Sequence, residues 1–288
     1  MLSIDEKRVY DDQGGVTEAY VASGVGLVRV KVANDIVGEF DLRKRCDARD
    51  VTADGRTVAV ATDEDVLVSS RDDGESFTAT EFGPAVAVGY ADSELLAASP
   101  DGSVARRRDG EWTTLEAPTL EVRAIDGTLL ATAGGVYRLL GDELVHAGLE
   151  DARDVSVAGV PLAATADGLY KLGNGWMCER EGAFGTVAAS SRTEPGSLEV
   201  AHAAAGANVY THEDGEWVEV PPAGGSVAAI GYGEAVYAVT EDGEFLVAGE
   251  VGELSDVDRS PEETGTGQWW RSRTLGVTDV RALTVPDR

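Results

Sequence analysis

The sequence has few of the residues from which disulfide frameworks and metal sites are built. Among its 288 residues are two cysteines and three histidines. Cys46 and Cys178 are isolated, so they cannot form a disulfide framework or a CxxC metal motif. The histidines show no HxH or HxxxH spacing, and no Gly-rich phosphate loop follows a strand and opens a helix. We therefore expect no metal site and no cofactor.

Positive charge is also scarce. Lys and Arg together number 24 against 52 Asp and Glu, which gives a formal net charge of -28. A surface of this sign repels nucleic acid on average, so we expect no DNA or RNA partner. An acidic, lysine-poor chain is similar to proteins of salt-accumulating haloarchaea, because molar salt shortens the Debye length to about 3 Å and screens self-repulsion.

Long apolar runs are absent. No segment is apolar enough over the length that a bilayer requires. The amino-terminal run MLSIDEKRVYDD carries charge where a signal peptide has its apolar core. These features predict a cytoplasmic protein without membrane contact, and we expect it to be a monomer.

An internal repeat dominates what the sequence does contain. A short apolar segment opens the repeat, followed by a strand rich in Ala and Val, a Gly or Asp-Gly turn and further strands, which together indicate a four-stranded antiparallel meander. The opening segments are DARDVTA from Asp47, PAVAVGY from Pro84, EVRAIDG from Glu121, DARDVSV from Asp151, GTVAASS from Gly185, GSVAAIG from Gly225 and DVRALTV from Asp279.

One such sheet cannot bury both of its faces, but several sheets stacked around an axis can. The sequence therefore predicts an all-β fold, a single β-propeller domain over residues 1–288 with about seven blades. Six blades remain the alternative if the short unit near Asp151 merges with its successor. The first unit lacks an opening strand, so we expect Val280–Val285 to pair with Glu18–Ser23 and close the ring.

The stretch SSRDDGESF fits the pattern S-x-D-x-G-x-[ST]-[FW] and resembles the Asp-box, or BNR repeat, of sialidase-like propellers. The residues that match are Ser70, Asp72, Gly74, Ser76 and Phe77. Gly74 suits a turn with positive φ, and Asp72 can accept backbone N–H groups. The resemblance implies a structural hairpin with Phe77 packed between neighbouring sheets, away from any active face.

The whole chain also resembles an uncharacterised family of haloarchaeal β-propeller proteins. The acidic repeat and the IDEKRVY run from Ile4 to Tyr10 carry this resemblance. It adds no catalytic residue. The repeats are of the broad WD40 and YVTN kind, in which propellers act as binding platforms.

A second pattern, an acid two residues before an arginine, recurs where four units begin. The pairs are Asp47 with Arg49, Glu121 with Arg123, Asp151 with Arg153, and Asp279 with Arg281. Residues two apart on a strand share a face, so we expect four guanidinium groups at the channel mouth, joined by Arg45 from the RKRCD loop. These arginines either bind an anion or tie neighbouring blades together, and the sequence leaves both interpretations open.

The predicted function is a non-catalytic binding or scaffolding propeller that recognises a protein partner or a small anionic ligand at the channel face. The alternative is a hydrolase acting on a carbohydrate or related substrate. The Arg-Ile/Leu-Pro motif of sialidases is absent. Catalytic residues are not identified, and whether the protein is an enzyme stays open. A hydrolase should place two or three carboxyl groups with perturbed pKa values in one pocket.

Overall fold

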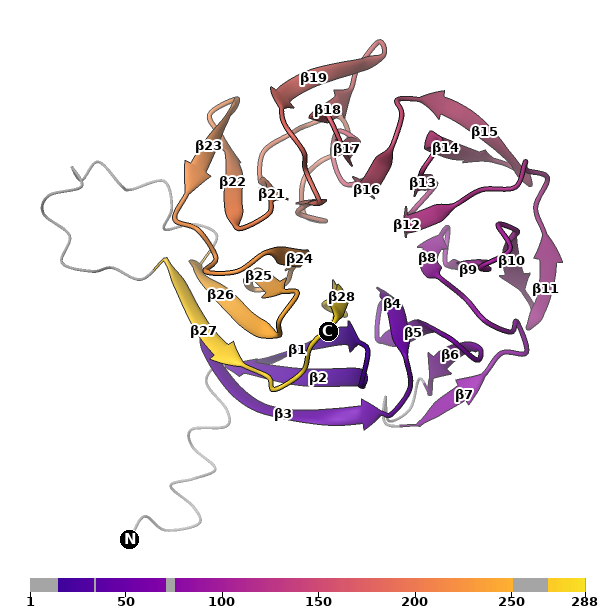
Figure 1. Cartoon of the computed structure of the whole chain (residues 1–288), viewed down its shortest axis with the longest axis horizontal. Coiled ribbons are helices and arrows are strands. Elements are labelled where there is room, and N and C mark those ends of the chain that lie inside the picture. The colour runs from indigo at the N-terminus through magenta and orange to yellow at the C-terminus, as the bar shows by residue number, and fades with distance from the viewer. Residues whose placement is uncertain (1–14, 34, 71–75, 251–268, 288) are drawn as a thin grey trace, which may run out of the picture.

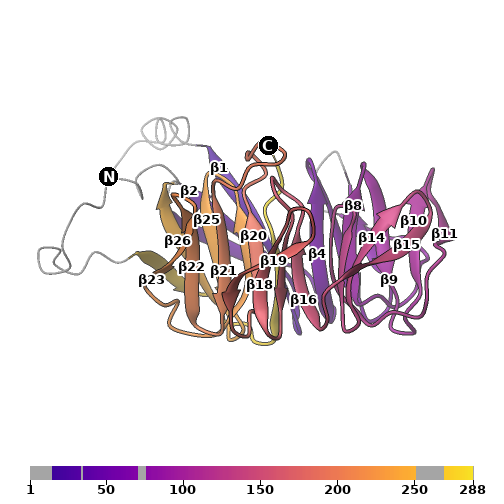
Figure 2. The same ribbon diagram turned by 90° about the horizontal axis from the view of Figure 1, so that it is seen from above.

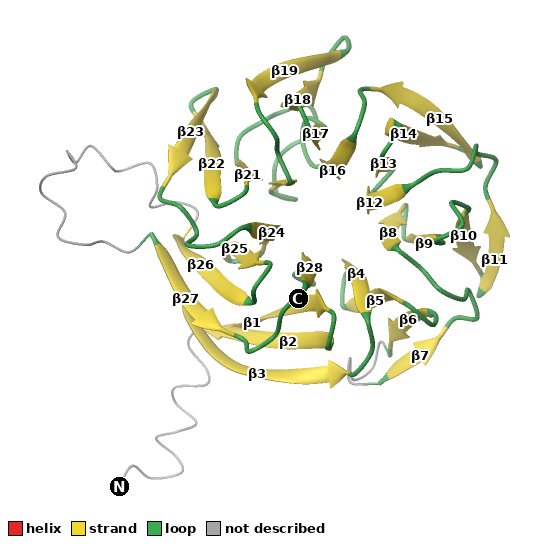
Figure 3. Cartoon of the chain, in the orientation of Figure 1, coloured by secondary structure: helices red, strands yellow, loops and turns green. Residues whose placement is uncertain are grey.

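The computed structural model describes residues 15–33, 35–70, 76–250 and 269–287. In these residues the chain forms seven four-stranded antiparallel sheets arranged as blades around a central axis (Figure 1). Figure 3 shows strands and loops only, and the same part of the chain contains no helix that is long and apolar enough to cross a membrane. The prediction of a seven-bladed β-propeller is confirmed.

The blades follow one another in chain order, and the strands of each blade run from the channel outward. The first three blades are β28 (Val280–Thr284), β1 (Val16–Ser23), β2 (Gly26–Ala33) and β3 (Ile36–Lys44); β4 (Ala48–Asp54), β5 (Thr57–Thr62), β6 (Val66–Ser69) and β7 (Phe77–Ala79); and β8 (Ala87–Ala91), β9 (Glu94–Ala98), β10 (Val104–Arg108) and β11 (Glu111–Thr114). The next two are β12 (Val122–Asp126), β13 (Leu129–Thr132), β14 (Gly135–Leu140) and β15 (Glu143–Gly148); and β16 (Ala152–Ser156), β17 (Leu162–Thr165), β18 (Gly168–Leu172) and β19 (Trp176–Glu181). The last two are β20 (Thr186–Ala189), β21 (Ala201–Ala205), β22 (Asn208–Glu213) and β23 (Glu216–Val220); and β24 (Val227–Tyr232), β25 (Ala235–Thr240), β26 (Glu244–Glu250) and β27 (Trp270–Thr274).

The second strand of each blade forms the middle of the core. All six residues of β25 are buried, as are all four of β17, because both faces of these strands pack against neighbouring sheets. Small Ala and Val side chains suit this position, since adjacent blades approach closely near the axis. Figure 2 shows the strands standing side by side across a flat disc.

The ring closes through both chain termini. Strand β28 pairs antiparallel with β1, placing Leu283 opposite Val21 and Ala282 opposite Ala22. On the outside of the same junction, the Arg273 guanidinium donates to the carbonyl oxygens of Val37 at 2.9 Å and Gly38 at 2.7 Å. The predicted closure is confirmed, and the unit beginning at Asp151 is a complete blade, so the six-blade alternative is wrong.

Tryptophans on outermost strands tie neighbouring blades together. The indole N–H of Trp112 donates to the Thr80 carbonyl of the preceding blade at 3.1 Å. Trp176 and Trp270 make the equivalent bonds to the carbonyls of Ala147 and Pro221; these are 2.9 and 3.1 Å long. Each ring therefore fills the space between two blades while its one polar group is satisfied.

The hairpin that resembles an Asp-box is described only in part. The Ser70 N–H donates to the Ser76 carbonyl at 2.8 Å, and Phe77 lies partly buried against the core shared by the first two blades. Asp72 and Gly74 lie outside the described residues, as does the Ile4–Tyr10 run. Assignment of an Asp-box therefore stays a prediction.

Candidate functional site

The inner strands of the seven blades enclose a channel with a cavity of about 420 Å³. Arg49, Arg123, Arg153 and Arg281 all line this cavity, so the structure brings together four of the five predicted arginines. Arg45 differs, because it is exposed on the loop between β3 and β4 and does not line the cavity.

β-Bulges aim the four arginines into the channel. In the second blade Ala48 lies opposite Thr62 and Asp50 lies opposite Ala61, which leaves Arg49 as an extra residue in β4. The same register shift makes Arg123, Arg153 and Arg281 the extra residues of their strands. Such a bulge leaves one residue out of the ladder and redirects its side chain.

The acids and arginines do not lie on one regular strand, but three of the four predicted pairs form ion pairs: Arg49 with Asp47, Arg123 with Glu121, and Arg281 with Asp279. The four acids precede the first residues of β4, β12, β16 and β28, and thus lie in the turns at the channel mouth. Asp151 and Asp279 adopt positive φ angles of 45° and 58° there, a conformation that Asp tolerates better than most residues.

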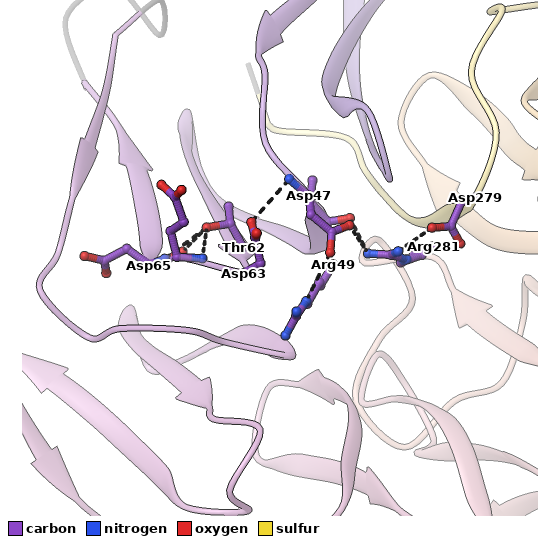
Figure 4. A network of polar contacts seen from close by, with 9 residues as sticks. Asp47, Arg49, Thr62, Asp63, Asp65, Asp279 and Arg281 are labelled. Carbon is purple, nitrogen blue, oxygen red and sulfur yellow. Dashed lines mark hydrogen bonds and ion pairs between the residues drawn. The ribbon is translucent and has the colours of Figure 1, made fainter.

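Two of the arginines, Arg123 and Arg281, clamp one blade to the next, and we call them the clamped arginines. The Arg281 guanidinium donates to Asp47 Oδ1 at 2.7 Å and to the Ala48 carbonyl at 3.3 Å, both in the following blade (Figure 4). Arg123 makes the same pair of contacts with Asp151 and the Ala152 carbonyl. For these two residues the structure supports the blade-tying interpretation.

Arg49 and Arg153 have no such partner among the described residues, and we call them the unclamped arginines. The blades that follow them open with Pro84 and Gly185 segments and therefore offer no aspartate at the clamping position. Arg49 has only Asp47 of its own blade, 3.5 Å from its Nε. Within the described residues, Arg153 makes no ion pair and no side-chain hydrogen bond.

Three aspartates lie beside the arginines on the channel wall. We call Asp50, Asp126 and Asp154 the channel acids, and all three line the same cavity. Each accepts a backbone N–H from the following blade: Asp50 from Val88 at 2.9 Å, Asp126 from Val157 at 2.8 Å, and Asp154 from Val187 at 2.9 Å. The sequence alone did not predict these acids as site residues.

A signal for two of them is present in the sequence. The DARDV segments place Arg and Asp side by side inside an apolar strand, once at Arg49 and Asp50 and once at Arg153 and Asp154. Two adjacent charged residues interrupt the alternation of a strand, and a bulge lets both reach the channel.

Burial of the channel acids disfavours their ionised forms. Desolvation raises the pKa of Asp50 to about 7, and the Asp154 carboxylate adds to this rise, while N–H donation by Val88 and Val51 opposes it. Desolvation likewise raises the pKa of Asp154 to about 6, with a further contribution from Asp126. The pKa of Asp126 is raised by desolvation too. The three groups are thus electrostatically coupled across one cavity.

Replacing Asp50 by Asn should flatten the dependence of stability on pH. A carboxyl with a folded-state pKa near 7 and an ordinary value of 3.8 keeps its proton in the folded protein between those values. Its contribution to the free energy of unfolding therefore falls as pH rises from about 4 to about 7. The asparagine side chain carries no charge and keeps one oxygen, which can accept one of the two backbone N–H groups that Asp50 accepts from Val51 and Val88.

Denaturant unfolding between pH 5 and pH 8 measures this effect. We expect Asp50→Asn to lose less stability than the wild type over that range. Asp92→Asn, in an exposed turn with positive φ, is the matched control and should follow the wild type. If the free energy of unfolding of Asp50→Asn falls with pH as steeply as that of the wild type, the raised pKa of Asp50 is contradicted.

Other polar groups near the channel give no metal centre. Among the described residues, no group of three His, Cys, Asp or Glu side chains could hold a metal ion. Tyr232 lines the cavity, and its hydroxyl lies 2.6 Å from Nδ1 of the buried His202. Burial lowers the pKa of His202 to about 4, so this imidazole is neutral at neutral pH.

A more open recess of about 620 Å³ adjoins the channel at its mouth. Gly185, Ala228 and Arg281 line both spaces. The inner strands of the sixth and seventh blades place small residues here, where the corresponding strands of four other blades present arginine. The mouth is therefore asymmetric: β28, β4, β12 and β16 each contribute one guanidinium group, whereas β8, β20 and β24 contribute none.

Solved structures that resemble this chain include WD40 domains. The Nidogen/Laminin complex matches with a TM-score of 0.58 at 8% identity, over 93% of this chain and 98% of that one. The WD40 β-propeller domain of Doa1 matches with a TM-score of 0.56 at 17% identity, over 70% and 79%. The Pan2 WD40 domain of Neurospora crassa matches with a TM-score of 0.55 at 13% identity, over 78% and 86%. Identities this low show a shared fold alone.

No curated protein matches the sequence closely enough to count as a relative. A family model does match, over residues 3–286, and its description reads "Beta-prop_HVO_0234:-like, beta propeller". That range includes all seven blades. The chain therefore belongs to the HVO_0234-like beta-propeller family.

Proposed function

We propose that this propeller is a non-catalytic binding protein that takes a small anionic ligand into its channel. The observation that carries the proposal is the difference between the two kinds of arginine. The clamped arginines direct their charge to the next blade. The unclamped arginines line the cavity of about 420 Å³, and among the described residues neither forms an ion pair with an acid of another blade.

The chemistry of the unclamped arginines favours an anion. A guanidinium presents a planar fork of N–H donors that matches a carboxylate or a phosphate. On a chain of net charge -28, these two groups give a small anion charge-assisted hydrogen-bond donors inside the channel. If no small molecule binds, the remaining alternative is that the channel mouth binds a protein partner. The proposed setting is a salt-rich cytoplasm.

Isothermal titration with inorganic phosphate, sulfate, citrate and butyrate tests the proposal, with glucose as an uncharged control. The titrations should be run at constant ionic strength in chloride. We expect at least one anion to bind at one site per chain and to raise the melting temperature; saturation at a hundred times the dissociation constant adds about 2.7 kcal/mol. If none of these anions binds more tightly or raises the melting temperature more than chloride does at the same ionic strength, the proposal is wrong.

A hydrolase is the second candidate, and the channel acids are the observation that favours it. Three carboxyl groups with raised pKa values in one cavity are what acid and base catalysis requires. Each nevertheless accepts a backbone N–H of the next blade, which accounts for its position structurally. Turnover of a glycoside substrate that is abolished in Asp154→Asn would support this second candidate.

A further inference from the structure

Charges of both signs alternate along the channel wall. Arg49 precedes Asp50 directly, Arg153 precedes Asp154 directly, and Asp126 lies three residues beyond Arg123 on its strand. One residue of a strand advances about 3.3 Å. Since the bulges shorten the advance at Arg49, Arg123 and Arg153, the channel acids lie between the level of the arginines and about 10 Å farther along the channel.

Within the described part of the chain, no protein cation neutralises the channel acids. Their hydrogen-bond donors there are backbone N–H groups and, for Asp154, the Thr186 hydroxyl at 2.7 Å. The clamped arginines point instead to Asp47 and Asp151 at the mouth. An ionised carboxylate that is desolvated without a counter-charge is unfavourable. A cation bound beside the channel acids would therefore stabilise their ionised forms.

The cation that fits is an organic ammonium group. A metal ion is disfavoured because the described residues offer no group of three ligands that could hold one. An ammonium group needs only hydrogen-bond acceptors on one side and can donate to the carboxylate oxygens in directions that the backbone N–H groups leave open.

We propose that the channel ligand is a small zwitterion, whose anionic group binds the unclamped arginines and whose ammonium group binds the channel acids. This inference rests on the proposed function and narrows its ligand class. The spacing along the wall corresponds to an ω-amino acid or a compound of similar length, and the cavity of about 420 Å³ has room for one.

Ionisable groups on every side of the cavity affect the pH dependence of this binding. Besides the channel acids they are Arg49, Arg123, Arg153, Arg281, Tyr232 and Asp287. Because burial raises the pKa of Asp50 to about 7 and that of Asp154 to about 6, these two carboxyls ionise between pH 5 and pH 8, so an ammonium group should be held better at pH 8.

The experiment compares matched probes by isothermal titration of the full chain. The probes are the ω-amino acids from glycine to 6-aminohexanoate, together with butyrate and butylammonium, at pH 5 and pH 8. We expect one ω-amino acid of the series to bind about tenfold or more tightly than butyrate at pH 8, and this preference to shrink at pH 5. Asp126→Asn should reduce the preference for this ω-amino acid over butyrate at pH 8.

The outcomes separate this inference from the proposed function. If butyrate binds as tightly as every ω-amino acid at pH 8, the channel takes anions and the zwitterion inference fails alone. If butylammonium equals the best ω-amino acid, the anionic group contributes nothing, and both the inference and the proposed function fail. If no probe and no anion binds, both fail as well. The pH comparison uses the wild type, so it does not depend on how well a variant folds.

Discussion

Removal of strand β28 is expected to abolish cooperative folding of the propeller. Val280 and Leu283 are 4% and 9% exposed and belong to the core between the last and first blades. Burial of each such side chain contributes about 1.5 to 3 kcal/mol, and the strand also pairs with β1 from Tyr20 to Ser23. The sum approaches the whole stability of a typical domain, about 5 to 15 kcal/mol.

Thermal unfolding followed by circular dichroism measures the loss. A chain ending at residue 277 should show no sharp transition, because its first blade would expose the inner edge of β1 to solvent. A chain ending at residue 285 keeps β28 and should melt like the full protein. A sharp transition within a few degrees of the wild type in the shorter chain would contradict closure by β28.

The importance of β28 could be predicted because the repeat leaves a gap at one end of the chain and a surplus at the other. DVRALTV repeats the opening segment of a blade but has no second strand after it, while Glu18–Ser23 has no opening strand before it. Apolar alternation and Gly turns are local signals, and they recur seven times. Blade number and closure therefore followed from counting the repeats.

The channel wall was harder to predict because its geometry depends on ladder register. As adjacent residues, Arg49 and Asp50 would lie on opposite faces of a regular strand. The bulge that changes this adds one residue to the strand and leaves no mark in its composition. The structure shows both lining the cavity. The sequence analysis also did not predict which arginines are clamped. Clamping requires an aspartate at the start of the following blade, as at Asp151, and fails where that blade begins with glycine, as at Gly185.

The channel acids could not be identified as site residues from the sequence. In a chain with 52 Asp and Glu, no single acid is conspicuous. Asp126 lies in EVRAIDG, one of the seven opening segments, and nothing in that segment shows that its carboxyl accepts the Val157 N–H of the next blade. Burial and coupling of acids from three blades arise only when the ring is assembled.

The two kinds of arginine should separate binding from stability when they are replaced in pairs. We expect Arg49→Ala with Arg153→Ala to weaken binding of the tightest anion of the panel by about a hundredfold or more. The reason is that each charge-assisted hydrogen bond contributes about 1.5 to 3 kcal/mol, or roughly one to two factors of ten. The melting temperature should change little, because neither side chain ties two blades together.

The matched control, Arg123→Ala with Arg281→Ala, removes two clamps at the same level of the channel. These partly exposed ion pairs contribute about 1 kcal/mol each, so the melting temperature should fall by roughly 2 to 4 °C per clamp. Affinity for the anion should stay within a few-fold of the wild type. If both pairs instead lower the melting temperature equally and neither alters binding, all four arginines serve only to join blades. The ligand site would then have to lie elsewhere on the propeller.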